Sequence, residues 1–316
     1  MKTSSEQARL IEALADTDLT ALEYSCSGLG GVASPMRLRT EWAGFLVQTG
    51  DGEKRYAKVL YDDMRPLIDV EQTVLASRAA ALTGVTPALY LADVERGVLL
   101  FDALPDDAWR WARVDDLTAP DRLERLWDLK RKVHCGPDPG FHRSFVADIA
   151  RLRALCDRDA VVLPSGHEWL DECVEMASSA LESGRDTTPV PLHGDGAASN
   201  VMVGPDDTLA LVDFDRGGTG DAWYDVAVVL NELYQFEPQW RDGIRFWSGQ
   251  CEEADYARCR LYAFVDDWYW TLWGLWLGTT SSRRLEFTKL SQWTLQRCRQ
   301  TIRDPRFEGW LRAFKG

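Results

Sequence analysis

Residues 189–227 read PVPLHGDGAASNVMVGPDDTLALVDFDRGGTGDAWYDVA, and this stretch carries most of the information about the fold. The apolar runs VMV and LALV lie on either side of GPDD, which begins at Gly204. Two short apolar runs separated by such a turn sequence are typical of a β-hairpin. A hairpin of this length folds the chain back on itself, so we expect Asp213 to lie beside Asn200.

Polar residues stand in a fixed order around this hairpin. Asp195 follows His193 by two residues, Asn200 follows Asp195 by five, and the triplet DFD begins thirteen residues later at Asp213. Phosphoryl transfer uses one carboxylate to orient and deprotonate the acceptor hydroxyl, and an amide with a second carboxylate to hold magnesium against a triphosphate. The order of these residues therefore indicates phosphoryl-transfer chemistry. It disfavours the alternative, an acidic hairpin in an unrelated α/β protein.

The segment HGDGAASN followed by DFD resembles the aminoglycoside phosphotransferase and choline kinase superfamily. The resemblance implies an α+β, bilobal, protein-kinase-like fold. Its N-terminal lobe would be a small antiparallel sheet that binds the nucleotide, over residues 1–104. Its larger C-terminal lobe, over residues 105–316, would be mainly helical and would hold the catalytic and substrate-binding residues.

The same resemblance implies a role for each polar residue of the segment. Asp195 would be the catalytic base, and Asn200 and Asp213 would be the magnesium ligands. Asp215 would be an auxiliary carboxylate near the metal, on the substrate side. His193 would support the loop backbone by hydrogen bonding. The expected cofactors are therefore ATP and Mg²⁺.

Composition limits the range of partners. The 316 residues have a formal net charge of −14, and 45% are hydrophobic, as in ordinary soluble domains. The acidity disfavours nucleic acid as a partner and suits a small cationic substrate, although it is equally compatible with a role in solubility alone. The N-terminal segment lacks an apolar signal region, and Asp266 and Asp267 interrupt the longest apolar stretch, residues 261–278. We therefore expect a cytoplasmic protein with reduced cysteines and no membrane segment, and a homodimer is left open.

The first hundred residues are expected to bind the nucleotide. Gly28, Gly30 and Gly31 lie in a glycine-rich turn ahead of the strand-like residues 36–40 and 44–48. Backbone amides in such a turn can approach phosphate oxygens because glycine has no side chain to block them. Glycine-rich turns are common, so this turn gains weight only from its position upstream of the catalytic segment. The absence of a GxxxxGK[ST] motif disfavours a P-loop NTPase.

A lysine and a glutamate complete the predicted nucleotide site. The segment RYAKVL alternates like a strand and places Lys58 among apolar neighbours, with Lys54 as a nearby competitor. Lys58 resembles the kinase lysine that contacts the α- and β-phosphates. A helix is predicted over residues 65–83, ending at Gly84 as its C-cap, and Glu71 near its start is expected to pair with Lys58.

Residues 87–93 and 97–102 are predicted to form two further strands. Asp102 and Leu104 would then lie at the hinge between the lobes, where backbone groups would hydrogen-bond adenine, as the resemblance implies. Helical patterns dominate the rest of the chain, with helices expected over residues 121–134, 142–157 and 165–183.

The substrate residues are expected after the DFD triplet. Residues 225–234 are predicted to form a helix, and the resemblance implies that Asp225 near its beginning braces the catalytic loop. Glu232 and Tyr234 lie on a polar and aromatic edge of the same predicted helix. We expect both side chains to face the substrate.

Residues 256–277 are predicted to form an aromatic-rich helix that contains WYWTLWGLW. Here the resemblance narrows toward choline and ethanolamine kinases, whose C-terminal lobe has a similar tryptophan-rich helix. Trp270 and Trp273 are three residues apart and share a helix face, so their rings could form a partial aromatic cage for a cation. The alternative is that both rings belong to the core. Leu290 stands where choline kinases usually present another tyrosine, which leaves the cage incomplete.

The function expected from the sequence is ATP-dependent phosphorylation of a hydroxyl on a small cationic amino alcohol such as choline or ethanolamine. One alternative is an aminoglycoside-type antibiotic kinase, which would share the catalytic residues but need a wider acidic cleft. A second alternative is a nucleotide-binding pseudokinase regulator. The intact set of Lys58, Asp195, Asn200 and Asp213 argues against that second alternative.

Overall fold

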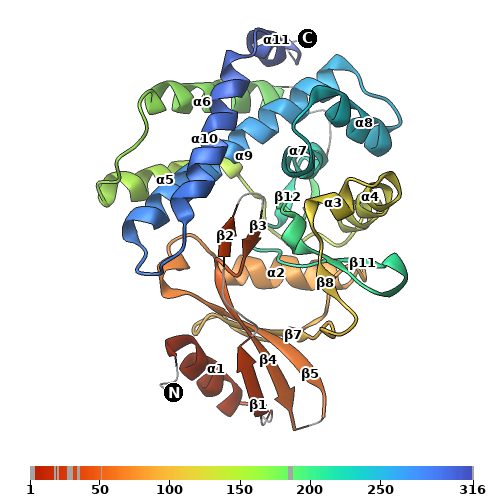
Figure 1. Cartoon of the computed structure of the whole chain (residues 1–316), viewed down its shortest axis with the longest axis vertical. Helices are drawn as coiled ribbons and strands as arrows, with labels where there is room; N and C mark the ends of the chain where they lie inside the picture. The colour runs from red at the N-terminus through yellow and green to blue at the C-terminus, as the bar shows by residue number, and fades with distance from the viewer. Residues whose placement is uncertain are drawn as a thin grey trace.

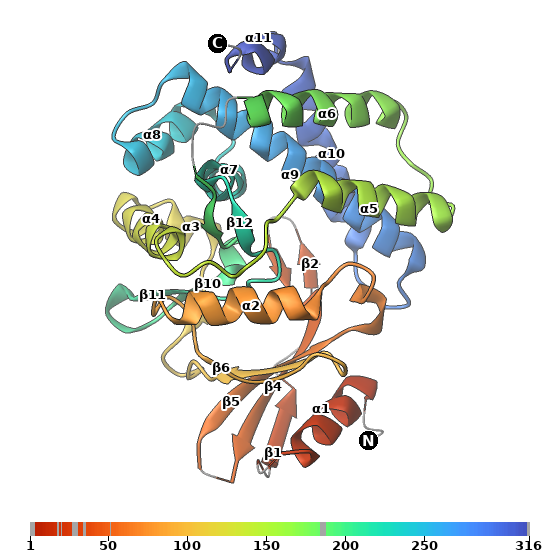
Figure 2. The same ribbon diagram turned by 180° about the vertical axis from the view of Figure 1, so that it is seen from behind.

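The computed structural model describes residues 4–17, 19, 21–26, 31–33, 36–50, 52–183 and 188–314. A small N-terminal region built on one sheet lies against a larger, mainly helical C-terminal region (Figure 1), and the view from behind shows the same two-part arrangement (Figure 2). The expected α+β class, with a small antiparallel sheet ahead of a helical region, is confirmed. The boundary between residues 104 and 105 stays a prediction.

A five-stranded antiparallel sheet forms the N-terminal region. One face of the sheet packs against α1 (Ser5–Ala15), where Leu14 joins Ala57 and Val59 in a small core. Because successive side chains of a strand point to opposite faces, Lys58 lies on the other face, toward the helical region. In spatial order the strands are β1 (Ala21–Cys26), β4 (Trp42–Thr49), β5 (Lys54–Leu60), β7 (Val98–Asp102) and β6 (Leu89–Asp93).

The helix α2 (Val70–Ala81) lies between this sheet and the C-terminal region (Figures 1 and 2). It begins five residues later than predicted because the extended Asp69 caps it, its side chain accepting a hydrogen bond from the Gln72 N–H at 3.1 Å. The predicted C-cap is also wrong. The helix ends at Ala81 with Leu82 as its C-cap, and Gly84 adopts a left-handed conformation, with φ of 73°, two residues after the cap.

A separate hairpin, made of β2 (Gly31–Ala33) and β3 (Met36–Leu38), lies between the sheet and the C-terminal helices (Figures 1 and 2). In the described part of the chain it forms its own two-stranded sheet and is not paired with the five-stranded one. β3 contacts the short 3-10 turn η2 (Ala198–Asn200), and β2 contacts α10 (Phe287–Arg303). The hairpin therefore reaches from the N-terminal region into the C-terminal one.

The C-terminal region is assembled around α9 (Glu253–Thr280), whose buried residues are not confined to one face. Such a pattern is expected of a helix surrounded by other helices. α9 packs against α5 (Phe145–Arg158), α6 (His167–Ser183), α7 (Ala222–Leu233) and α10, and the other helices are α3 (Val114–Leu117), α4 (Pro120–His134), α8 (Glu237–Ser248) and α11 (Phe307–Arg312). The three predicted helices after residue 120 are confirmed as α4, α5 and α6. Within the described ranges, no helix is long and apolar enough to cross a membrane.

Residues 189–227 place their polar side chains between the two regions. The predicted hairpin is confirmed, and the Val212 N–H donates to the Asn200 carbonyl at 2.9 Å, so Asp213 follows directly beside Asn200. The strand pairs here are β9 (Val190–Leu192) with β12 (Gly218–Gly220), and β10 (Val201–Val203) with both β11 (Leu209–Leu211) and β8 (Arg110–Trp111). The short turns are η1 (Asp62–Met64), before α2, and η3 (Pro205–Asp207), inside the hairpin.

Candidate active site

Residues 193–200, the predicted catalytic loop, rest on Asp225, which is fully buried in the first turn of α7. Its carboxylate accepts hydrogen bonds from the N–H groups of His193 and Gly194 at 3.0 and 2.9 Å. It also accepts from Lys130 at 3.1 Å and from His134 at 2.9 Å. Burial opposes its charge, but Lys130 and His134 hold the pKa of the carboxyl well below its usual range. The predicted bracing role of Asp225 is confirmed.

His193 fixes the loop to the strand before Asp213. Burial and the charge of Lys130 lower the pKa of the imidazole, so the ring is neutral and has one N–H donor. Its Nε2 lies 2.9 Å from the Val212 carbonyl, and its Nδ1 lies 2.9 Å from the Asp195 carbonyl and 3.0 Å from the Lys130 Nζ. Each ring nitrogen thus faces a backbone carbonyl, so the ring ties Asp195 in the loop to Val212 directly after β11. The predicted support of the loop by His193 is confirmed.

The two glycines of the loop are required by close packing. Gly194 has φ of 78°, and a Cβ there would lie 2.0 Å from the carbonyl oxygen of Arg216. A Cβ at Gly196 would lie 2.2 Å from the carbonyl oxygen of Val228. Side chains at these positions would push the loop off its support, so both glycines help to place the Asp195 side chain that lies between them.

The DFD triplet holds Lys58 by its two carboxylates. Asp213 adopts a left-handed conformation with φ of 71° and accepts a hydrogen bond from the Lys58 ammonium at 2.6 Å. Asp215 accepts from the same ammonium at 3.3 Å and also accepts from the indole N–H of Trp42. Burial opposes the charge on Lys58, yet Asp213 and Asp215 keep its pKa above the ordinary value. Because burial and the neighbouring charge of Asp213 act on Asp215, its pKa is raised well above the usual range.

The predicted pair between Glu71 and Lys58 is not formed in the structure. Glu71 lies in the first turn of α2 and is exposed, whereas Lys58 donates to Asp213 and Asp215. The physical reason is the start of α2 at residue 70, which sets the direction of its first turn. The ammonium therefore takes its counter-ions from the C-terminal region.

A cavity of about 420 Å³ opens between the two regions. Of the residues predicted to bind nucleotide, it is lined by Lys58, Asp102 and Leu104. Gly31 begins β2 and is not part of the described lining. Gly28 and Gly30 lie outside the described residues. Other lining residues come from β3 and the residue after it, from β5, from the hinge, from β10 and from the DFD segment, including Arg37, Leu38, Arg39, Tyr56, Phe101, Trp109, Met202 and Phe214.

The side chains that could hold a divalent cation meet at the wall of this cavity. Asn200 and Asp213 both line it, and both also line the smaller cavity beside Asp195. They offer an amide oxygen and a carboxylate oxygen, and Mg²⁺ is a hard cation that takes a few protein oxygens together with phosphate oxygens. The donor set therefore fits magnesium.

Two small cavities lie on the far side of Asp195, and Trp270 lines both. The first, about 40 Å³, is lined by Asp195, Asp215, Trp270 and Trp273 among others. The second, about 20 Å³, is lined by Glu232 and Trp270 among others. The Trp273 ring packs edge-on against Trp270, with centroids 5.3 Å apart, and both side chains are buried. The structure thus brings four of the five predicted substrate-side residues together.

Tyr234 is the fifth predicted substrate residue, and the structure places it elsewhere. Its ring lies against Gly243 of α8, and its carbonyl accepts a hydrogen bond from the Trp240 indole at 3.0 Å. Residues two apart on a helix do not share a face, so Glu232 and Tyr234 at the end of α7 point in different directions. Glu232 accepts the Ala198 N–H at 3.4 Å, and burial raises its pKa to about 7.

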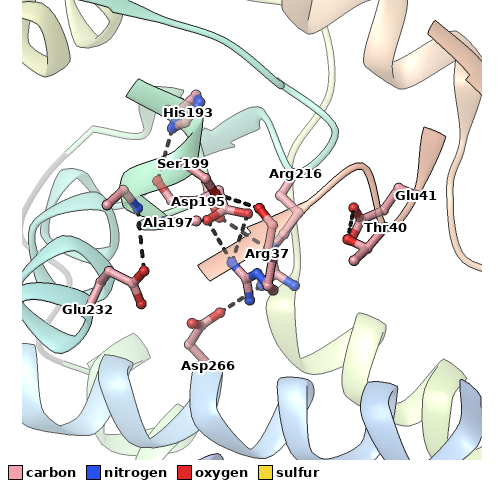
Figure 3. A network of polar contacts seen from close by, with 12 residues as sticks. Arg37, Thr40, Glu41, His193, Asp195, Ala197, Ser199, Arg216, Glu232 and Asp266 are labelled. Atoms are coloured by element: carbon pink, nitrogen blue, oxygen red, sulfur yellow. Dashed lines mark hydrogen bonds and ion pairs between the residues drawn. The ribbon is translucent and has the colours of Figure 1, made fainter. Parts of the chain in front are cut away.

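Arg37 of β3 lies at the centre of the site (Figure 3), although no local sequence pattern points to it. Its guanidinium donates to the two carboxylate oxygens of Asp195 at 3.0 and 3.3 Å and stacks 3.5 Å from the centroid of the Trp270 ring. Its backbone carbonyl accepts a hydrogen bond from the Ser199 hydroxyl at 2.6 Å. The hairpin is thereby joined to the residue next to Asn200.

A second arginine, Arg216, follows the DFD triplet and is almost fully buried. It donates to the Tyr224 hydroxyl at 2.6 Å, to Asp266 at 3.0 Å and to the Gly194 carbonyl at 3.2 Å. Its guanidinium lies 3.9 Å from the centroid of the Tyr269 ring. Arg216 therefore fastens the loop before Asp195 to α9, the helix that carries the aromatic residues.

The comparisons with known proteins agree with this geometry. Residues 37–262 match the phosphotransferase enzyme family, APH. A search of curated protein sequences gave no match.

Several solved structures are similar across nearly their whole length. A choline/ethanolamine kinase family protein from Mesorhizobium loti is 20% identical, with 92% of this chain and 94% of that one covered and a TM-score of 0.72. Choline kinase LicA from Streptococcus pneumoniae is 13% identical, with 94% and 100% covered and a TM-score of 0.73. The GDP complex of wild-type aminoglycoside 2'-phosphotransferase-IIIa is 13% identical, with 94% and 98% covered and a TM-score of 0.61. These likenesses confirm the predicted bilobal, protein-kinase-like fold.

The family match covers more than half of the chain, from Arg37 through residues 193–200 and the DFD triplet to residue 262. The chain therefore belongs to the phosphotransferase enzyme family.

Proposed function

We propose that the protein is a magnesium-dependent kinase that transfers the γ-phosphoryl group of ATP to the hydroxyl of a small cationic amino alcohol. The observation that carries this proposal is a cation held directly beside Asp195. A guanidinium lies over the Trp270 ring, and Asp195 pairs with it. An aromatic face with a carboxylate at its edge also suits an ammonium group, because the ring quadrupole attracts cations of either kind.

The nucleotide would lie in the large cavity between the two regions. The N–H groups of Asp102 and Ala103 already donate to the carbonyls of Ala88 and Lys54, at 3.0 and 3.3 Å. The next backbone N–H along the chain, that of Leu104, would therefore be free to donate a hydrogen bond to adenine. A cavity of about 420 Å³ is within the range of small-ligand sites.

The charges of the triphosphate would be met at the inner end of the cavity. Lys58 would contact phosphate oxygens, and Asn200 and Asp213 would hold the magnesium ion. When bound there, the ion would neutralise charge on the β- and γ-phosphates. This placement agrees with Lys58 and Asp213 lying 2.6 Å apart at the wall of the cavity.

The transfer itself would depend on Asp195. Its carboxylate would orient the acceptor hydroxyl and take its proton as the acceptor oxygen forms a bond to the γ-phosphorus. The bond between that phosphorus and the β-phosphate oxygen would break at the same time, and ADP would leave. The support formed by Asp225 and His193 would keep Asp195 aligned during this step.

Two features favour an amino alcohol over the alternatives. The acceptor side is narrow and walled by Trp270, Trp273, Leu290 and Trp293, whereas an aminoglycoside would need a wide acidic cleft. Against a pseudokinase, the structure brings Lys58 to Asp213 and Asp213 to the side of Asn200.

The test is ADP release in the presence of ATP and magnesium with choline, ethanolamine or an aminoglycoside as acceptor. We expect release that depends on choline or ethanolamine and is lost in Asp195→Asn. Release that depends only on the aminoglycoside would establish the antibiotic-kinase alternative. No release with any acceptor, from a folded protein that binds ATP, would count against the proposal.

A further inference from the structure

The chain supplies its own cation to the acceptor site. The Arg37 guanidinium lies where the charged group of a cationic acceptor would lie, stacked 3.5 Å from the Trp270 ring centroid and bonded to Asp195 at 3.0 and 3.3 Å. The Ala197 N–H donates to one of the same carboxylate oxygens at 2.6 Å. Both oxygens of Asp195 thus accept from the Arg37 guanidinium, so an acceptor hydroxyl has to compete with Arg37 for this carboxylate.

The surroundings of this guanidinium form a cation site. Two further carboxyl groups, Glu232 and Asp266, are close enough for the charge of Arg37 to lower their pKa values, although burial raises both. Arg216 neutralises Asp266 at 3.0 Å. The remaining negative charge around the Trp270 ring is balanced in part by Arg37, which is supplied by the hairpin.

The space beside Arg37 is too small for an acceptor. The two cavities on this side, about 40 and 20 Å³, are both lined by Arg37 and Trp270. Both are far smaller than the cavity of about 420 Å³ between the two regions, and small-ligand sites usually measure about 300 Å³ or more. Withdrawal of the guanidinium would join them into one space in front of Asp195.

The element that carries Arg37 is suited to such a movement. The β2–β3 hairpin forms its own two-stranded sheet in the described part of the chain. It is held to the catalytic loop by the Ser199 hydroxyl, which donates to the Arg37 carbonyl at 2.6 Å, and by contacts of β2 with α10. The Arg37 side chain is also partly exposed, at 13%.

We propose that Arg37 is an internal competitor for the acceptor: the ammonium group of the acceptor takes the place of the guanidinium between Trp270 and Asp195. Arg37 thereby sets the affinity for cationic acceptors and keeps Asp195 engaged until one arrives. The inference rests on the proposed function in one respect, that the acceptor is a cation. The apparent affinity of a ligand falls in proportion to the fraction of protein in which its site is open.

The test measures binding of tetramethylammonium and of choline, without nucleotide, by calorimetry and by tryptophan fluorescence. Arg37→Met removes the charge and keeps a long side chain. Arg37→Lys keeps a positive charge but lacks the planar guanidinium group. Arg131→Met is the matched control, because Arg131 also stacks on a tryptophan, 4.9 Å from the Trp247 ring centroid, but lies outside the site.

We expect Arg37→Met to lower the Kd of both cations by about tenfold or more, Arg37→Lys to lower it less, and Arg131→Met to leave it unchanged. Millimolar guanidinium should compete with choline in Arg37→Met more strongly than in the wild type. In turnover with ATP, the KM for choline should fall.

An unchanged or weaker affinity in folded Arg37→Met would overturn the inference, as would the absence of cation binding in every variant. A large fall in kcat with unchanged Kd would also overturn it and would place Arg37 in the transfer step. The proposed function can fail separately. Tighter cation binding by Arg37→Met, without phosphorylation of any amino alcohol, would leave the inference standing and reject the acceptor class.

Discussion

Two pairs of a carboxylate and a cation flank the predicted catalytic loop, residues 193–200. The pair of Lys130 and Asp225 lies behind the loop, and the pair of Arg37 and Asp195 lies in front of it, on the proposed acceptor side. The two pairs differ in burial and in the elements that supply them. Behind the loop, the Lys130 and Asp225 side chains are 1% and 0% exposed and come from helices α4 and α7. In front of it, the Arg37 and Asp195 side chains are 13% and 11% exposed, and Arg37 comes from the small β2–β3 hairpin.

We infer from this difference that the pair of Lys130 and Asp225 is a permanent part of the fold, whereas Arg37 in the other pair can be replaced by a ligand. Removing one partner of a fully buried pair leaves a charge with neither water nor counter-ion, which is strongly destabilising. A partly exposed pair that joins two regions of a protein can exchange one partner for a ligand at much smaller cost. We therefore expect changes at Lys130 to act on folding and changes at Arg37 and Asp195 to act on binding and turnover.

The strongest test of the comparison is Asp195→Asn. It should lower turnover by about 10²- to 10⁴-fold, because it removes the group that orients and deprotonates the acceptor hydroxyl. The midpoint of urea unfolding should stay near that of the wild type, since the side chain lies on the exchangeable side. Steady-state kinetics together with unfolding followed by circular dichroism checks both parts. Near-wild-type turnover would remove Asp195 from the mechanism.

The next test breaks the buried support. Lys130→Met should lower the free energy of unfolding by about 3–5 kcal/mol, because the buried Asp225 carboxylate loses the ammonium that is paired with it. The adjacent Arg131→Met should cost less, about 1–2 kcal/mol, because its ion pair with Asp128 is largely exposed and the carbonyls of Phe246 and Trp247, to which it also donates, are neutral. Urea titration of both variants measures the difference. Equal losses would show that burial does not distinguish the two pairs.

Part of this arrangement could be predicted from the sequence. The order of Asp195, Asn200 and Asp213 identified the loop and its hairpin, because those contacts are local and follow from turn and strand patterns. Lys130 could also have been found from the sequence. It falls at helical spacing among the buried Leu126, Trp127 and Val133, and a lysine on the apolar face of a helix indicates a buried charge with a partner.

The parts of the site that could not be predicted depend on contacts between segments far apart in the sequence. Arg37 and Asp195 are 158 residues apart, and Trp42 and Asp215 are 173 apart, so no local pattern pairs them. The strand that carries Arg37 was predicted, but the direction in which its hairpin leans is set by tertiary packing. The Glu71 prediction was wrong for the same reason, because it depended on the orientation of α2.

A smaller effect should separate the roles of the two tryptophans. In the Arg37→Met background, Trp270→Leu should raise the Kd of tetramethylammonium about tenfold, or about 1.4 kcal/mol, because it removes the face on which the cation lies. With Arg37 present the loss should be smaller, since the same ring also holds the competing guanidinium. The four Kd values of this double-mutant cycle measure the coupling.

Trp273→Leu is the control for that cycle. Trp273 is 1% exposed and packs between Trp270 and Phe287, so its replacement should act mainly on stability. A Kd change equal to that of Trp270→Leu would restore the two-ring cage predicted from the sequence.

The smallest expected effect is a pH dependence of cation binding through Glu232. Burial raises the pKa of this carboxyl to about 7, with Arg37 and Arg297 acting in the opposite direction. The Ala198 N–H bond also lowers the pKa, and the charge of Asp195 raises it. Below pH 7 the group is neutral, and above it the group adds a negative charge to the cation site. The Kd of tetramethylammonium, whose own charge does not change with pH, should therefore fall by about two- to fivefold between pH 6 and pH 8.

The raised pKa of Glu232 also affects the stability of the fold. High pH favours cation binding, whereas low pH favours folding. A carboxyl whose pKa is higher in the folded protein than in the unfolded chain favours folding at low pH, and this contribution is lost as the pH rises through about 7. Glu232→Gln should therefore be more stable than the wild type at pH 8 but not at pH 4, and its Kd for tetramethylammonium should not vary with pH. A pH dependence of that Kd that persists in Glu232→Gln would assign the titration to another group. Such a result would leave Asp195 as the main negative charge that an incoming cation meets.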